Sequence, residues 1–117
     1  MSVTVFDPRA NELKSNPEYS FVKKWCGSVD EVFSSCDVVS LHLPLMDSTK
    51  NSITAAQFSK MKKGSYFINC ARGGVANEAD LLTALNDGTI AGAALDVFDK
   101  EPTPPDHPLV KHPKVIC

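Results

Sequence analysis

Short apolar runs alternate with amphipathic stretches along this chain, and the alternation predicts strands separated by helices. The apolar runs are rich in β-branched and aromatic residues, and several end at a proline or an aspartate, where a strand stops. The polar stretch between residues 9 and 20 has weak periodicity, so we predict a loop there with at most one helical turn. The predicted strands cover residues 3–6, 21–25, 38–43, 65–69, 90–98 and 115–117.

Capping residues predict where three helices begin. Ser28, Thr54 and Asn77 each precede an amphipathic stretch and are followed, three positions later, by a residue that favours a helix start. Glycines placed after the second and third stretches predict where those helices end, because glycine readily adopts the left-handed conformation of a helix C-terminus. The predicted helices cover residues 29–35, 55–63 and 78–87, the last two ending at Gly64 and Gly88.

The run between residues 90 and 98 is apolar almost throughout, rather than at alternate positions. Such continuity is typical of a strand in a parallel sheet that is covered on both faces. Five of the eight prolines lie in the segment that follows, between residues 101 and 114, so this segment is predicted to cross the surface irregularly. The order of elements predicts an α/β fold with a doubly wound, mostly parallel sheet.

The size and charge of the chain limit the classes of function that it can have. The chain has 117 residues, of which 43% are hydrophobic, enough to fill one core. Its net charge of −2 and scattered basic residues exclude a basic stripe for nucleic acid, and no apolar run is long enough to span a membrane. No signal-peptide pattern follows Met1, so we predict a cytoplasmic protein. The cysteines form no Cys-x-x-Cys pair and are predicted to be reduced thiols, three of them buried: Cys26, Cys36, Cys70 and Cys117.

Charged and polar residues follow the predicted strands where each strand ends. In an open parallel sheet the ligand binds beyond the carboxyl ends of the strands. We therefore predict that these residues form the rim of one shared crevice. An arginine after one strand and two carboxylates after the next indicate an enzyme site, or part of one. The rim residues are Asp7, residues 42–44, residues 70–72, Asp96 and Glu101.

Three motifs in this order resemble the D-isomer-specific 2-hydroxyacid dehydrogenase family, most closely its phosphoglycerate dehydrogenase type. They are residues 37–45 (DVVSLHLPL), residues 69–73 (NCARG) and residues 92–98 (GAALDVF) with Glu101-Pro102. The resemblance covers nearly the whole chain. It implies a Rossmann-type domain that binds NAD and transfers a hydride between nicotinamide and C2 of a D-2-hydroxy acid. It also implies a small 2-hydroxy or 2-oxo acid as substrate and a homo-oligomeric enzyme.

The resemblance assigns the two catalytic positions. It implies that Arg72 holds the substrate carboxylate, for which a planar fork of donors is suited. It implies that Glu101 pairs with a catalytic histidine and raises its pKa, so that the imidazole can take the hydroxyl proton during oxidation. Without the resemblance, Arg72 is an exposed arginine near a helix start and Glu101 is a loop carboxylate.

The remaining positions are implied to bind the cofactor. Asp7 matches the carboxylate that accepts hydrogen bonds from the adenosine ribose and repels the 2′-phosphate of NADP. From residues 1–20 alone, a turn residue before Pro8 is the favoured interpretation of Asp7, and the resemblance reverses that preference. Asp96 is implied to lie near the nicotinamide amide, although a strand-end carboxylate is an equal alternative. The other positions predicted to line the cofactor are Leu43, Pro44, Cys70, Ala71 and Arg72, and no metal is expected.

The sequence departs from the family pattern at both ends. A Thr-Pro-His segment is expected just after the last strand, but none follows within the chain, and His107 and His112 lie before that strand in the proline-rich crossing. We predict that both are solvated, and that His42 bonds to its neighbours rather than acting as a base. No Gly-x-Gly-x-x-Gly precedes Val3. We therefore expect residues 1–117 to be a partial NAD-binding domain without its first βα unit or a substrate domain, inactive alone.

The missing unit has a topological consequence. In the Rossmann order 3-2-1-4-5-6 the absent strand would lie between residues 3–6 and 38–43. If the chain folds alone, pairing these two strands gives the flavodoxin-like order 2-1-3-4-5, and a dimer that exchanges strands is the alternative. The functional alternative is a non-catalytic α/β module of flavodoxin-like topology that binds a ligand or partner through the same rim.

Overall fold

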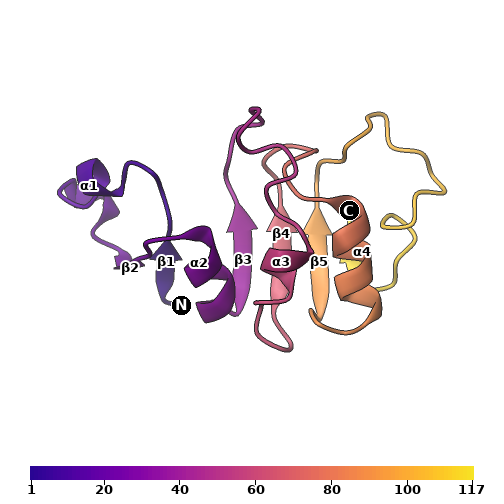
Figure 1. The fold of residues 1–117 in the computed structure, drawn as a ribbon, viewed down its shortest axis with the longest axis horizontal. Coiled ribbons are helices and arrows are strands. Elements are labelled where there is room, and N and C mark those ends of the chain that lie inside the picture. Colours follow the sequence, from indigo (N-terminus) through magenta and orange to yellow (C-terminus); the bar gives the residue numbers. More distant parts are fainter.

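The computed structural model describes all 117 residues and contains two separate parallel sheets. The smaller sheet pairs β1 (Val3–Val5) with β2 (Val22–Trp25). The larger sheet has the order β3-β4-β5-β6 (Figure 1). Its strands are β3 (Val38–Leu41), β4 (Tyr66–Asn69), β5 (Gly92–Leu95) and β6 (Val115–Ile116). The α/β class and the parallel pairing predicted from the sequence are therefore confirmed.

The helices begin at the predicted capping residues. Ser28, Thr54 and Asn77 each accept a hydrogen bond from a backbone N–H in the first turn of the helix that follows, and Thr54 forms a full capping box with Gln57. These helices are α2 (Val29–Ser35), α3 (Ala55–Phe58) and α4 (Glu78–Asn86). Two short helical turns, α1 (Ala10–Leu13) and η1 (Pro17–Tyr19), lie on the outer side of β2 (Figure 1).

Helix α3 is shorter than predicted. It ends at Phe58, after which turns closed by hydrogen bonds from Met61 N–H to Phe58 O and from Ser65 N–H to Lys62 O replace the helix. Phe58 and Met61 are both buried, so the irregular path still directs the apolar side chains into the core. Gly64, with φ +83°, belongs to the turn before β4 rather than to a helix end.

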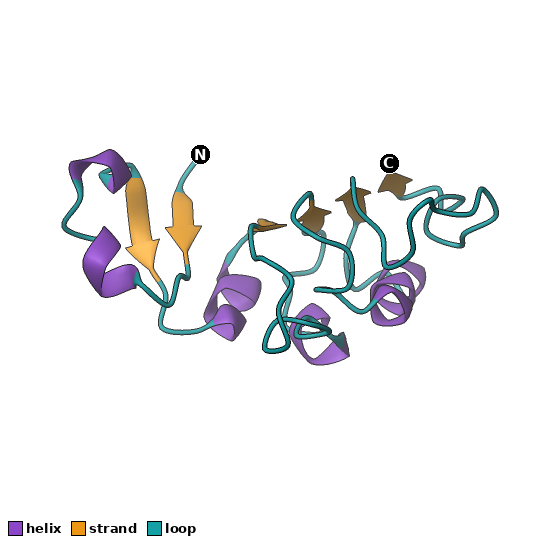
Figure 2. Cartoon of the chain, turned by 90° about the horizontal axis from the view of Figure 1, so that it is seen from above, coloured by secondary structure: helices purple, strands orange, loops and turns teal.

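The core lies between the larger sheet and the helices. Figure 2 shows α2, α3 and α4 along one face of this sheet. At the centre, Phe33 from α2, Phe58 from α3 and Phe67 from β4 are fully buried, with ring centroids 5.1 to 6.4 Å apart in tilted and edge-on arrangements. Between α2 and α3, hydrogen bonds from the Lys60 ammonium and the Gln57 amide hold the pKa of Asp30 below its usual range.

The opposite face of the larger sheet is not covered within this chain, so the prediction of cover on both faces is wrong for it. Outward-facing Val38, Tyr66 and Ile116 are 52%, 52% and 75% exposed. The physical reason lies in the connections. The strands follow one another across the sheet in one direction, and successive right-handed crossovers then place every connection on the same face.

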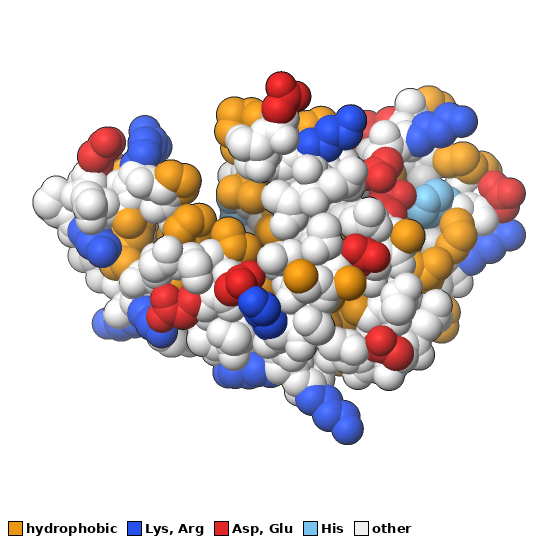
Figure 3. All heavy atoms as spheres, in the orientation of Figure 1, with side chains coloured by type: hydrophobic (Ala, Val, Ile, Leu, Met, Phe, Trp, Pro, Cys, Tyr) orange, Lys and Arg blue, Asp and Glu red, His pale blue; other side chains and the backbone are white.

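The flavodoxin-like rearrangement is also wrong, because β1 and β3 are not paired. A space-filling view shows the molecule hollowed between the smaller sheet and the larger one (Figure 3). Helix α2 separates the two sheets. On one side Glu31 pairs with Lys24 of β2 at 2.6 Å, and on the other Asp30 pairs with Lys60 beyond α3.

None of the helices has the length and apolarity that a membrane span requires.

Candidate active site

The strands bring the predicted site residues to one edge of the molecule, the upper edge in Figure 1. The residues follow β1, β3, β4 and β5, and all lie beyond the carboxyl end of the preceding strand. Asp7 follows β1, Leu43 and Pro44 follow β3, Cys70, Ala71 and Arg72 follow β4, and Asp96 and Glu101 follow β5.

Asn69, the last residue of β4, shapes the turn that carries Arg72. Its side chain is buried, donates from Nδ2 to the Arg72 carbonyl and accepts from the Ala71 N–H, both at 3.1 Å. The Asn69 carbonyl accepts from the Asp96 N–H at 3.1 Å, which ties the ends of β4 and β5 together. Asn69 was not predicted as a site residue. A polar residue at the end of a buried strand was the available signal.

The loops after β4 and β5 approach each other closely. A Cβ atom at Gly73 would overlap the Phe98 carbonyl oxygen, so only glycine fits at this contact. The Gly74 N–H donates to Asp99 Oδ1 at 2.7 Å, and the Phe98 N–H donates to Glu101 Oε1 at 3.2 Å. Arg72 and Glu101 are therefore carried by loops in direct contact.

The Arg72 guanidinium is exposed and forms no ion pair with a carboxylate of the chain. Its Nη1 donates to the Ala71 carbonyl at 2.6 Å, within its own loop. An arginine with its charge uncompensated beside a sheet edge is suited to bind an anionic ligand bidentately.

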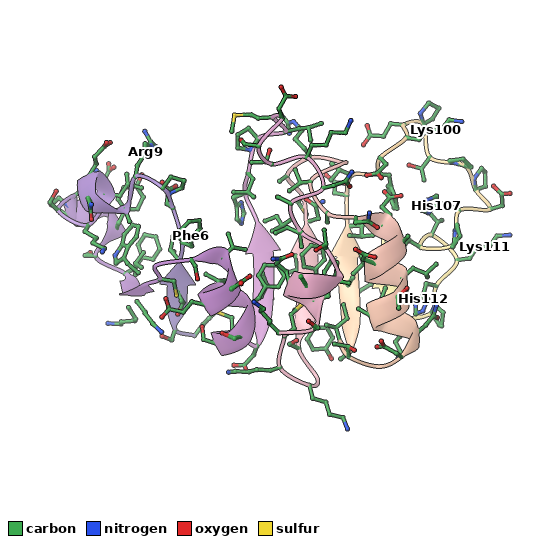
Figure 4. All side chains as sticks on the ribbon, in the orientation of Figure 1. Phe6, Arg9, Lys100, His107, Lys111 and His112 are labelled. Atoms are coloured by element: carbon green, nitrogen blue, oxygen red, sulfur yellow. The ribbon has the colours of Figure 1, made fainter.

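Asp7 lies apart from these loops, because it follows β1 of the smaller sheet. It is half-buried, and its Oδ1 accepts from the Arg9 N–H at 2.7 Å. Figure 4 shows Arg9 at the upper edge, just beyond this turn. Asp7 therefore forms the turn considered above, and this turn uses one of its two carboxylate oxygens.

The three histidines have different surroundings. His42, one residue beyond β3, bonds through Nε2 to Ser40 Oγ at 3.0 Å, as predicted. The prediction that His107 and His112 are solvated is wrong, because both are half-buried. His107 pairs with Glu78 at 3.1 Å, and His112 bonds to Asn86 at 3.2 Å. Both histidines attach the proline-rich crossing to α4, which no local sequence pattern revealed.

All four cysteines are free thiols, but only Cys26 is fully buried, so the prediction of three buried cysteines is wrong. Burial raises the pKa of the Cys26 thiol, which leaves it protonated and unreactive at neutral pH. Cys70 and Cys117 are exposed at the carboxyl ends of β4 and β6. No group of three or more histidine, cysteine or acidic side chains is placed to hold a metal ion.

Comparison with known proteins identifies the family. The sequence model described as "D-isomer specific 2-hydroxyacid dehydrogenase, NAD binding domain" matches residues 1–117. The chain belongs to the D-isomer specific 2-hydroxyacid dehydrogenase family. It is an NAD-binding domain of that family, and the family and cofactor predicted from the sequence are therefore confirmed.

Individual relatives agree with this assignment. A D-3-phosphoglycerate dehydrogenase of Bacillus subtilis (strain 168) is 45% identical over 122 residues, covering 100% of this chain and 21% of the relative. A glyoxylate reductase of Thermofilum pendens is 48% identical over 88 residues, covering 75% of this chain and 26% of the relative. The chain thus spans about a quarter or less of the length of these relatives.

Solved structures confirm the fold. The D-isomer specific 2-hydroxyacid dehydrogenase of Lactobacillus delbrueckii ssp. bulgaricus, solved in complex with NAD, superposes with a TM-score of 0.83 at 36% identity. The match covers 98% of this chain and 37% of that structure. The arrangement of the two sheets is therefore that of a Rossmann-like NAD-binding domain.

Proposed function

We propose that this NAD-binding domain serves an NAD-dependent oxidoreductase that transfers a hydride between nicotinamide and C2 of a D-2-hydroxy acid. The observation that carries the proposal is the contact between the two loops that present Arg72 and Glu101 at the carboxyl ends of β4 and β5. When bound, NAD supplies the nicotinamide ring that accepts or donates the hydride. The following roles belong to residues of this chain.

Arg72 binds the substrate carboxylate. Its guanidinium presents parallel N–H donors to two carboxylate oxygens, and the chain itself provides no competing carboxylate. Fixing the carboxylate also fixes the adjacent C2 atom, which is the atom that must face the nicotinamide ring. Arg72 therefore orients the substrate as well as binding it.

Glu101 holds the catalytic histidine, for which this chain offers no candidate: His42, His107 and His112 are each bonded elsewhere. The Phe98 N–H fixes one carboxylate oxygen of Glu101. The exposed carboxylate can accept from an imidazole N–H and stabilise the imidazolium that forms when the hydroxyl proton is taken. We propose that this histidine comes from outside residues 1–117 and that the chain alone does not turn over substrate.

We propose that the cofactor binds along the rim formed by the residues that follow the strands. Asp7 is half-buried and follows β1 of the smaller sheet, and the other proposed cofactor residues follow β3, β4 and β5 of the larger sheet. We propose that Asp7 binds the adenosine ribose and that Asp96 lies near the nicotinamide amide. The remaining cofactor-lining positions in this proposal are Leu43, Pro44, Cys70 and Ala71.

Arg72→Ala in the full-length protein tests the proposed reaction. We expect NAD affinity to change less than about threefold and kcat/KM for the 2-oxo acid to fall about a hundredfold or more, because a charge-assisted bidentate contact that orients the substrate is lost. Fluorescence titration with NADH and steady-state kinetics measure the two quantities. 3-Phosphoglycerate, 3-phosphohydroxypyruvate and glyoxylate are the first substrates to assay, since relatives named for both reactions match this chain. Unchanged kinetics in the variant would contradict the role of Arg72.

Asp7→Asn tests the preference for NAD over NADP. The asparagine oxygen still accepts from the Arg9 N–H, so the turn is preserved and only the negative charge is removed. We expect the ratio of NAD to NADP affinity to fall about tenfold, because the repulsion of the 2′-phosphate disappears. Glu12→Gln, which removes an exposed carboxylate on α1 of the same unit, is the matched control. Equal ratios in the wild type and Asp7→Asn would exclude Asp7 from the ribose site.

We further propose that the protein acts in the cytoplasm, where the exposed thiols of Cys70 and Cys117 remain reduced.

A further inference from the structure

A chain of polar contacts joins the loop after β4 to the loop after β5 and to helix α4. The Gly74 N–H donates to Asp99 Oδ1 at 2.7 Å, and the Asp99 N–H donates to Glu78 Oε1 at 2.8 Å. The second Glu78 oxygen pairs with His107 Nε2 at 3.1 Å. We call the Gly74–Asp99–Glu78 contacts the loop bridge. It connects segments that lie 21 and 25 residues apart in the sequence.

Glu78 is a firm anchor for the loop bridge. It is the first residue of α4, where the helix dipole favours a negative charge, and its side chain is only 20% exposed. Both of its carboxylate oxygens are engaged, one by a backbone N–H and one by an imidazole. The His107 ring, labelled in Figure 4, also packs edge-on against Phe98 with centroids 5.4 Å apart, so the proline-rich crossing contacts both Glu78 and the loop after β5.

The loop bridge acts where the two proposed catalytic residues are attached. Gly74 lies two residues after Arg72, and Asp99 lies two residues before Glu101. Gly73 contacts the Phe98 carbonyl beside the bridge and sets the minimum separation of the loops. The hydrogen bond from Gly74 to Asp99 opposes separation of the loops. The distance between the loops is therefore restrained from both directions.

We propose that Asp99 and Glu78 are positioning residues that hold the Arg72 loop and the Glu101 loop at a fixed separation. The catalytic part of this inference rests on the proposed function, in which Arg72 fixes the substrate carboxylate and Glu101 holds the histidine that moves the hydroxyl proton. Both groups act on neighbouring atoms of one small substrate. A loop displacement of about 1 Å is enough to reduce the rate about a hundredfold.

Amide hydrogen exchange tests the loop bridge independently of catalysis. We expect the Gly74 amide to exchange at least about tenfold faster in Asp99→Ala, which removes its acceptor, and also in Glu78→Ala, which does not touch Gly74 but releases Asp99. Asp99→Asn keeps the acceptor oxygen and should retain protection. Asp80→Ala is the matched control, because it removes a carboxylate of the same helix that accepts from the Ala55 N–H and not from these loops.

The exchange result decides whether a change at Glu78 reaches the Gly74 amide through Asp99. Faster Gly74 exchange in Glu78→Ala but not in Asp80→Ala supports the bridge. Equal exchange in Glu78→Ala and the wild type would overturn it. Because an unstable variant exchanges everywhere, the comparison uses the Phe67 amide of the core strand β4 as a reference for global opening.

Steady-state kinetics of the full-length protein test the catalytic part of the proposal. We expect Asp99→Ala to lower kcat/KM for the 2-oxo acid at least about tenfold with unchanged NADH affinity, and Asp99→Asn and Asp80→Ala to stay within about threefold of the wild type. Wild-type kinetics in Asp99→Ala would overturn the positioning role. If the wild type itself neither binds NADH nor reduces any 2-oxo acid, the proposed function fails instead, together with the catalytic part. The exchange experiment then still decides on the bridge.

Discussion

Gly73→Ala should separate the loops that present Arg72 and Glu101 and reduce kcat/KM about a hundredfold or more. The added Cβ would overlap the Phe98 carbonyl oxygen and lie 3.0 Å from the Asp99 nitrogen. These are backbone atoms, so no side-chain rotation can relieve the overlap and one loop must move. Movement of about 1 Å at the reacting groups is expected to cost about two orders of magnitude in rate. Steady-state kinetics of the full-length protein measure the loss of kcat/KM.

Gly64→Ala is the matched control for this change. Gly64 has φ +83°, but a Cβ there meets no atom within 4 Å, so the substitution costs only the conformational strain, about 1 kcal/mol. It should lower stability slightly and leave kcat/KM within about threefold of the wild type. Equal kinetics for Gly73→Ala and Gly64→Ala would show that the contact between the two loops does not govern catalysis.

Phe67→Ala is expected to remove a large fraction of the stability of the protein. Phe67 is fully buried, and its ring lies 5.1 Å from Phe58 and 6.4 Å from Phe33, so the substitution removes the centre of the aromatic cluster. Such a truncation costs about 3–5 kcal/mol. Proteins of this size are stable by about 5–15 kcal/mol in total, and one face of the larger sheet lacks cover within this chain.

Urea denaturation followed by circular dichroism measures this loss. Phe21→Ala is the control, because Phe21 is 57% exposed and its truncation should change the free energy of unfolding by less than about 0.5 kcal/mol. Phe67→Leu should fall between the two. A urea midpoint for Phe67→Ala equal to that of the wild type would show that the Phe33, Phe58 and Phe67 cluster is not the main stabilising core.

Much of the site was predictable because strand ends are local features. Arg72 and Glu101 follow apolar runs, and parallel strands deliver the residues after their carboxyl ends to one edge. Two supporting residues were not predictable in this way. Glu78 and Asp99 act through partners on other elements, and an isolated carboxylate in the sequence carries no signal of which backbone N–H it will accept from.

The local features follow from the amino-acid sequence alone: where helices start, which runs form strands, the α/β class and the family motifs. Each depends on residues within a few positions of one another. The Ser28 side chain, for example, caps a helix by accepting from a backbone N–H only three residues away. Other features depend on segments that are distant in the sequence, and they are set only when the whole chain is folded. They are the separation of β1 from β3, the uncovered sheet face, the pairing of His107 with Glu78 and the contact of Gly73 with Phe98. Their geometry is set by the packing of α2, α3 and α4 on one sheet face and by the direction of the crossovers, and a linear pattern records neither.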